Sequence, residues 1–172
     1  MCANEKMNYK CTGYHGTNSK CAQQILQSQL FRKSSDDEEW LGEGAYFFEN
    51  DKQQAVYYAK KAKKIIDYKV ISVNIQTNSL LDLIDTETYE AFQQFAYMLK
   101  DRYKKRKDKK PRQLMNSVVL NAMYKLKPYE VVRAAFPVAR TTVAPRTNIQ
   151  QMQVQVCVKE QKCISDIKEV AI

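Results

Sequence analysis

The sequence predicts a mixed α+β domain with mostly β character at both ends and helices between. Two patterns carry this prediction. Residues 68–75 and 152–158 alternate between two sets of side chains, as strands with two different faces do. Apolar residues recur at helical spacing from Cys21 to Leu26 and again from Ala55 to Ile65. With 172 residues, of which 44% are hydrophobic, the chain has enough apolar surface for one core. We therefore expect a single domain over residues 1–172.

The elements follow in order along the chain. Asn18 or Ser19 can cap the first helix, and Asn50-Asp51 followed by Gln53-Gln54 resembles the capping box of the second. Pro128 closes the last helix, and residues 31–43 and 137–148 have the composition of loops. Strands are expected at 10–15, 45–48, 68–75, 80–83, 131–136, 152–158 and 167–171, and helices at 19–30, 52–65, 87–100 and 113–126. One face of the second helix should be apolar through Ala55, Tyr58, Ala59, Ala62 and Ile65.

The net charge of +9 is concentrated in one segment, Lys100–Arg112, which holds nine basic and two acidic residues. We treat it as a basic insertion at about residues 100–112. A block this dense can neutralise several phosphates of RNA or DNA, and a solvated loop is the alternative interpretation. A small acidic cluster, Asp36–Glu39, precedes Trp40 and would repel phosphate if it lay near the same groove. The contacts expected for a nucleic acid come from Lys104, Lys105, Arg106, Lys107, Lys109 and Lys110.

The cysteines indicate a reducing compartment. Their number is five, they form no Cys-x-x-Cys pair, and the chain has one histidine, so we expect reduced thiols and no metal. Cys157 lies in an apolar stretch and is expected in the core rather than as a nucleophile. No apolar run has the length of a membrane span. The expected location is the cytoplasm, without membrane contact.

All four glycines lie in two short clusters. Gly13 and Gly16 flank the histidine His15, and Gly42 and Gly44 precede Tyr46. Glycine permits left-handed backbone and close approach, so both clusters predict backbone that lies against another group. A lone histidine is usually a surface or core residue, but these glycines and Thr17 beside it favour a site for a nucleotide-like ligand. There, the amide of Gly16 could pair with a carboxamide while the imidazole donates to a ribose hydroxyl.

These strings resemble a known family. Tyr14-His15-Gly16-Thr17, then Leu41-Gly42-Glu43-Gly44-Ala45-Tyr46-Phe47, then Ala55-Val56-Tyr57-Tyr58-Ala59 are similar to the ADP-ribosyltransferases of the diphtheria-toxin and PARP type. The resemblance covers residues 12–60, returns near the C-terminus, and extends to small toxin-like bacterial members. It implies an ADP-ribosyltransferase-like split β-sheet core with surrounding helices.

The resemblance also implies NAD+ as co-substrate and a role for each matching residue. His15 would bond ribose hydroxyls of NAD+, and Gly16 would hold the nicotinamide amide through its backbone, with Thr17 beside it. Tyr46, preceded by Gly44, would stack on the nicotinamide ring. Either Tyr57 or Tyr58 would close the other face; spacing favours Tyr57, and Tyr58 has the register of a core residue.

The third motif residue of the family is usually a glutamate, and here the matching position is Gln155, or Gln153 if the register is off by two. A glutamine accepts a hydrogen bond but supplies no charge and no base. We therefore expect transfer of a single ADP-ribose unit. Three acids could substitute, Glu43, Glu49 and Glu160, and the candidates for binding phosphate are Arg133, Arg140 and Arg146.

The function predicted from the sequence is an NAD+-dependent mono-ADP-ribosyltransferase, with catalytic residues His15, Tyr46 and Gln155. Its acceptor could be nucleic acid, and its setting a bacterial toxin or defence system with an antitoxin partner. The alternatives are a protein mono-ADP-ribosyltransferase, an NAD+ glycohydrolase, and a catalytically silent NAD+- or RNA-binding module. The related RNA 2′-phosphotransferases rely on a second histidine, which this chain lacks.

Overall fold

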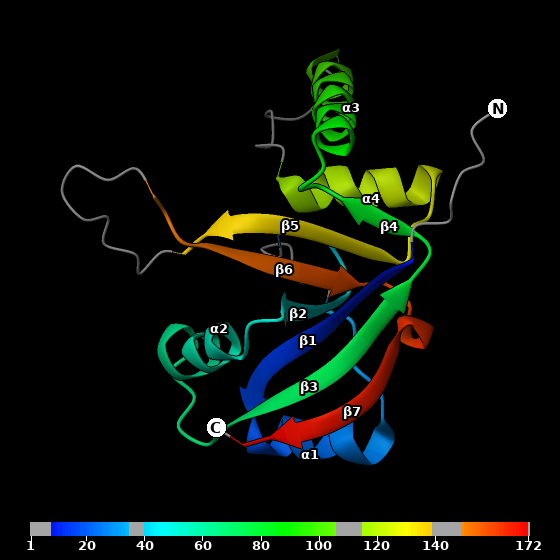
Figure 1. Cartoon of the computed structure of the whole chain (residues 1–172). Helices are drawn as coiled ribbons and strands as arrows, with labels where there is room; N and C mark the ends of the chain where they lie inside the picture. Colours follow the sequence, from blue (N-terminus) through cyan, green and yellow to red (C-terminus); the bar gives the residue numbers. More distant parts are fainter. Residues whose placement is uncertain (1–7, 35–39, 106–114, 139–148, 172) are drawn as a thin grey trace.

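The computed structural model describes residues 8–34, 40–105, 115–138 and 149–171, and it is an α+β domain, as the sequence predicts (Figure 1). The described strands form a seven-stranded sheet in the order β4-β5-β6-β2-β1-β3-β7. The strands are β1 (Tyr9–Asn18), β2 (Ala45–Glu49), β3 (Tyr68–Thr77), β4 (Leu80–Asp82), β5 (Val131–Pro137), β6 (Met152–Val158) and β7 (Ile164–Val170). The helices are α1 (Ser19–Ser28), α2 (Lys52–Tyr57), α3 (Thr86–Lys105) and α4 (Asn116–Leu126), with short turns η1 (Tyr58–Ala62) and η2 (Gln161–Cys163).

The sheet consists of two parts with a narrow connection. β1 pairs with β3 along its whole length, from Tyr9 opposite Thr77 to Asn18 opposite Tyr68. In contrast, β1 and β2 share only two residue pairs, Gly13 with Glu49 and Tyr14 with Phe48. The strands β1-β3-β7 therefore form one part and β2-β6-β5-β4 the other, and α3 and α4 lie at the β4-β5 end (Figure 1).

Local capping explains where the first two helices begin. The side chain of Asn18 accepts a hydrogen bond from the Cys21 N–H at 2.8 Å, and that of Asp51 accepts one from the Gln54 N–H at 3.0 Å. Each satisfies an amide that the first helical turn leaves without a partner. Both caps confirm the sequence prediction, and they place both helices directly after strands.

The alternation of β6 divides the core between the two faces of the sheet. Val156 and Val158 pack with Phe47 on the face covered by α1, which we call the first face. Cys157 is fully buried with Leu120 on the opposite, second face, and its predicted place in the core is confirmed. Because side chains alternate along a strand, this assignment also fixes the face of every other residue of β2 and β6.

The apolar face predicted for the second helix is only partly correct. Ala55 and Ala59 are fully buried, but Tyr58 is 37% exposed and Ala62 is exposed. The cause is a change of helical period, because the regular helix ends at Tyr57 and a wider π-type turn follows. The core role considered for Tyr58 is therefore wrong.

Several predicted residues lie outside the described part of the chain. They are Arg106, Lys107, Lys109 and Lys110 of the basic insertion, and Arg140 and Arg146. Lys104 and Lys105 belong to the last turn of α3, and their side chains are not described. Among the residues that the structure describes, no helix combines the length and apolarity needed to span a membrane.

Gly16 should tolerate alanine poorly, because a Cβ there would lie 2.3 Å from the backbone carbonyl oxygen of Ala55 in α2. At Gly13 the nearest atom, at 2.6 Å, is the flexible end of the Ile75 side chain. We expect Gly16→Ala to lower the free energy of unfolding by about 1–3 kcal/mol, and by more than Gly13→Ala. Urea unfolding of both variants measures this, and equal losses would contradict the close packing of α2 on β1.

Candidate active site

The described sequence motifs meet where β1 and β2 separate. Their pairing ends at Tyr14 and Phe48, and beyond it the imidazole of His15 reaches across, its Nδ1 lying 2.9 Å from the carbonyl oxygen of Tyr46. A carbonyl only accepts hydrogen bonds, so Nδ1 carries the proton and donates. We call this region, from His15 to Asn18 on one side and from Ala45 to Phe47 on the other, the β1–β2 split.

The split leaves the backbone of Gly16 directed toward β2. Thr12 accepts a hydrogen bond from the Asn50 N–H at 2.8 Å, which shows that Thr12 directs its backbone groups to the β2 side. Alternate residues of a strand share this direction, so Gly16 does too. If the β1–β2 register continued, Gly16 would pair with Tyr46. The His15 imidazole instead takes the Tyr46 carbonyl, and the Gly16 N–H and C=O face the split.

His15 lies in an aromatic environment on the first face. Its ring centroid is 5.5 Å from that of Phe31 and 5.9 Å from that of Phe47. Burial disfavours the charged imidazolium and lowers the pKa of His15 below its ordinary value of 6.5, although the bond to the Tyr46 carbonyl opposes this. The ring is therefore neutral at pH 7, and Nε2 is an acceptor. The donation to a ribose hydroxyl expected from the sequence is corrected to acceptance from it.

Tyr46 is held by its hydroxyl. The phenol donates to the Gly42 carbonyl oxygen at 2.6 Å and accepts from the Leu41 N–H at 2.9 Å. Its ring lies on the second face, partly buried against the core cluster that contains Leu41 and Cys157. Residues Leu41–Gly44, which we call the glycine loop, thus fix the phenol at the edge of the split.

The glycine loop owes its glycines to geometry and packing. Gly42 has a φ of +77°, a left-handed conformation that other residues seldom adopt. A Cβ at Gly44 would lie 2.4 Å from the sulfur of Cys157 in β6. Gly44 therefore serves the close approach of the loop to β6, and its predicted part in cofactor binding is indirect at most.

The register places the two glutamines differently. Gln155 is paired with Phe48 of β2 on one side and Ala134 of β5 on the other. Gln153 is paired with Phe136 of β5, beyond the last β2–β6 pair. Both side chains lie on the second face with Tyr46, and Gln155 is the one adjacent to β2. This position favours Gln155 as the third motif residue.

The helix α2 contributes a residue that the sequence analysis did not assign to the site. Gln54 is 1% exposed, and its Nε2 has no hydrogen-bond partner among the described residues. Gln54 shares a side of α2 with Tyr57 and Tyr58, three and four residues later. That side faces β2, since the Tyr58 ring centroid is 5.9 Å from that of Phe48. The sequence analysis treated Gln54 only as part of a capping box. Its position next to Ala55, on the apolar face expected for the helix, was the sign that Gln54 could be buried.

Among those three residues, Tyr57 is half-buried and Tyr58 is exposed, with Lys63 5.6 Å above its ring. Thr17, by contrast, lies in β1 opposite Lys69, on the His15 side of the strand. The structure thus places His15, Gly16, Thr17 and Tyr46 along the β1–β2 split, with His15 on the first face and Tyr46 on the second. Gln155 lies opposite Phe48, where β1 and β2 are still paired, while Tyr57 ends α2 and Tyr58 begins η1.

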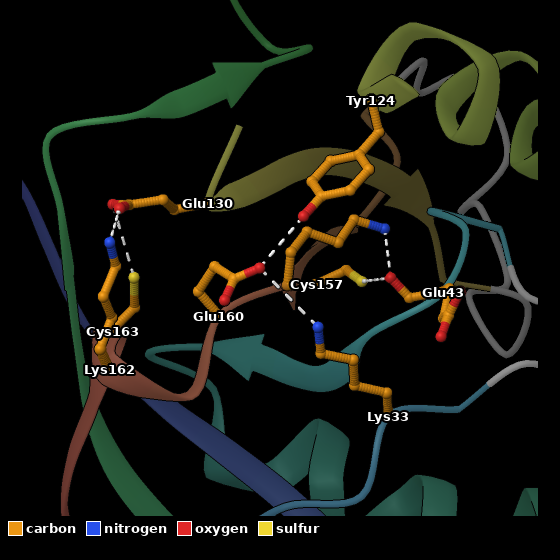
Figure 2. Close-up of polar contacts among 9 residues, drawn as sticks. Lys33, Glu43, Tyr124, Glu130, Cys157, Glu160, Lys162 and Cys163 are labelled. Atoms are coloured by element: carbon orange, nitrogen blue, oxygen red, sulfur yellow. Dashed lines mark hydrogen bonds and ion pairs between the residues drawn. The ribbon is translucent and has the colours of Figure 1, made fainter. Parts of the chain in front are cut away.

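Other charged candidates are occupied elsewhere. Arg133 lies 3.5 Å from Glu49 and 3.3 Å from Asp82, so its role as a phosphate ligand is not supported. Glu160 accepts a hydrogen bond from the Tyr124 hydroxyl at 3.0 Å and lies 3.8 Å from Lys33 (Figure 2). These ion pairs and hydrogen bonds make Glu49 and Glu160 structural residues.

The described site is made of neutral polar groups. The candidate groups are a histidine acceptor next to two aromatic rings, the amide and carbonyl of Gly16, and the carboxamides of Gln54 and Gln155. Such a set can bind a ligand that carries an amide, hydroxyls and a planar ring.

No protein-family model matches the sequence. The chain is similar to the uncharacterized protein MJ0359 of Methanocaldococcus jannaschii, with 30% identity over 146 residues that cover 77% of this chain and 68% of that protein. The similarity identifies a relative of this chain, and the name of that relative states no activity.

The pH dependence of stability should report the burial of His15. Because its folded pKa lies below 6.5, the unfolded chain takes up a proton first as the pH falls through 6.5, and the free energy of unfolding decreases. His15→Asn keeps an N–H donor for the Tyr46 carbonyl without this titration, and should lack the decrease between pH 7 and 5.5. Urea unfolding at several pH values tests this; His15 is the only histidine, so its NMR titration gives the folded pKa directly.

Proposed function

We propose that this chain, which belongs to the same family as the archaeal protein MJ0359, is an NAD+-dependent mono-ADP-ribosyltransferase on an ADP-ribosyltransferase-like split sheet. One observation carries the proposal. The β1–β2 pairing ends at the predicted His-Gly motif, and the imidazole that ends it leaves the Gly16 backbone directed into the split.

The Gly16 backbone suits the nicotinamide carboxamide. Its N–H can donate to the amide oxygen of the ligand, and its C=O can accept from the amide nitrogen, as a neighbouring strand would. Gln54 precedes Ala55, which packs on Gly16, and its Nε2 has no partner among the described residues, so it would donate a further hydrogen bond to the same group. A carboxamide therefore meets two donors and one acceptor.

The ribose and the leaving ring are assigned to the remaining residues. The Nε2 of neutral His15 accepts from a ribose hydroxyl, and the Gln155 carboxamide bonds another on the β6 side. Tyr46 flanks the nicotinamide, with Tyr57 on the helix side. These assignments keep NAD+ in one orientation with its ribose–nicotinamide bond in the split.

The reaction is a substitution at the ribose C1′. The C1′–N bond breaks, and its electron pair leaves with neutral nicotinamide. A nucleophile of the acceptor then forms a bond to C1′ and loses its proton to solvent. Gln155 supplies no negative charge to the oxocarbenium-like transition state, so transfer depends on the nucleophilicity of the acceptor and stops after one unit. The basic insertion favours RNA or DNA as acceptor, in the cytoplasm.

Incubation with NAD+ labelled on its adenylate, alongside total RNA, DNA and protein extract, tests the proposal. We expect label on nucleic acid, stoichiometric release of nicotinamide, and neither with His15→Ala. Label on protein would keep the enzyme class and change the acceptor, and free ADP-ribose would indicate a glycohydrolase. Binding of NAD+ without nicotinamide release would leave a silent binding module.

Gln155 and Gln153 provide a matched pair for the same assay. If Gln155 stands where a carboxylate would act, Gln155→Glu should raise nicotinamide release roughly tenfold or more, since it adds a charge opposite the developing cation. Gln153 lies two residues from Gln155 along β6, beyond the last residue paired with β2, so Gln153→Glu should leave the rate unchanged. Equal effects would remove Gln155 from its proposed position.

Gln54 and Gln53 separate binding from stability. Gln54→Leu removes a buried Nε2 that has no partner among the described residues, so stability should stay equal or rise by about 1–3 kcal/mol, while the KM for NAD+ increases several-fold. Gln53 is exposed, and Gln53→Leu should change neither quantity. Urea unfolding and initial rates decide; a loss of stability in Gln54→Leu with an unchanged KM would make Gln54 a structural residue.

A further inference from the structure

Lys159, the residue after β6, is a buried cation that the proposed reaction does not use. It is 4% exposed, and its Nζ donates to the carbonyl oxygen of Leu41 at 2.9 Å and to that of Glu43. Nζ also lies 5.9 Å from the ring centroid of Tyr129. The hydrogen-bond acceptors are thus backbone carbonyls of the glycine loop.

Burying an ammonium costs free energy, and partial charges on carbonyls repay less than a carboxylate would. Accordingly, desolvation lowers the pKa of Lys159, while Cys157 and Glu43 oppose the shift and Lys33 adds to it. Figure 2 shows Cys157 beside Glu43, whose carbonyl oxygen is 3.7 Å from the sulfur. A lysine kept here against this cost suggests a use for the contacts it makes.

Those contacts lead to Tyr46. Lys159 holds the carbonyls of Leu41 and Glu43, and the carbonyl between them, that of Gly42, accepts from the Tyr46 hydroxyl. Three consecutive carbonyls therefore point inward onto the Lys159 ammonium and the Tyr46 hydroxyl, and the Cys157 thiol lies 3.7 Å from those of Gly42 and Glu43. The far end of the loop is fixed separately, by the Gly44 N–H donating to the Ser34 carbonyl oxygen at 3.1 Å.

We propose that Lys159 is a positioning residue, which orders the glycine loop from inside and thereby sets the place of the Tyr46 ring at the β1–β2 split. This inference rests on the proposed function, because that function gives Tyr46 its contact with nicotinamide. Lys159 itself touches no substrate. Its effect on NAD+ passes entirely through the loop and the phenol.

A double-mutant cycle tests the link from both ends. Lys159→Met removes the donors at similar side-chain length, and Tyr46→Phe removes the hydroxyl. Each should lower kcat/KM for nicotinamide release by roughly ten- to a hundredfold, as misplacement of a positioned group does. The double variant should be no worse than either single one. Additive losses, or an unchanged rate in Lys159→Met, would overturn the proposal.

Lys162→Met is the matched control, since Lys162 is an exposed lysine three residues away, paired with Glu130 at 2.6 Å. It should keep the wild-type rate. If Lys159→Met does not fold, Lys159→Gln retains an N–H donor for the carbonyls and should lose less activity than Lys159→Ala. Equal losses in those two variants would count against the proposal.

A readout without NAD+ separates this inference from the proposed function. In protein labelled with 3-fluorotyrosine, the ¹⁹F signal of Tyr46 is identified by its absence in Tyr46→Phe. We expect Lys159→Met to shift that signal and Lys162→Met to leave it in place. If the wild type releases no nicotinamide, the proposed function fails, but the ¹⁹F shift still decides whether Lys159 positions Tyr46. An unmoved signal in Lys159→Met would refute the positioning role of Lys159.

Discussion

The hydrogen bond from His15 Nδ1 to the Tyr46 carbonyl determines the shape of the site. A β-ladder continues where each carbonyl meets a neighbouring amide, and here a side chain takes the carbonyl that Gly16 would use. The two parts of the sheet can therefore separate without leaving that carbonyl unpaired. Burial keeps the ring neutral, so one imidazole both closes the ladder and presents an acceptor to the split.

The same separation depends on close packing at glycine. The helix α2 lies directly on β1 because Gly16 has no side chain, and the buried Ala55 and Ala59 face it. This contact brings the Gln54 side of α2 next to β2, and the buried Nε2 of Gln54 has no hydrogen-bond partner among the described residues. A native fold seldom keeps such a group without reason, because the lost hydrogen bonds to water cost stability. Gln54 directly precedes Ala55, the residue that packs on Gly16, and under the proposed function a ligand supplies the missing acceptor.

Local features were predictable from the sequence, and the features that depend on register were not. The caps at Asn18 and Asp51 follow from residues next to each helix. The end of the β1–β2 ladder involves residues 31 positions apart, and no local pattern fixes that pairing. Lys159 lies two residues after Cys157 and is buried like it, but a charged side chain at this position predicts a surface residue. The π-type turn after Tyr57 likewise has no signature in the residues that form it.

Under the proposed function, the neutrality of the site limits the chemistry. His15 is held neutral, Gln155 would stand where a carboxylate offsets a developing cation, and the candidate acids Glu49 and Glu160 are engaged by other side chains. Binding and orientation then supply most of the acceleration, and these act fully only when the acceptor is also held in place. Water is a weaker nucleophile than a bound acceptor held in place. The site therefore favours transfer to a bound acceptor over hydrolysis, and the basic insertion offers a means of holding one whose phosphates are negatively charged.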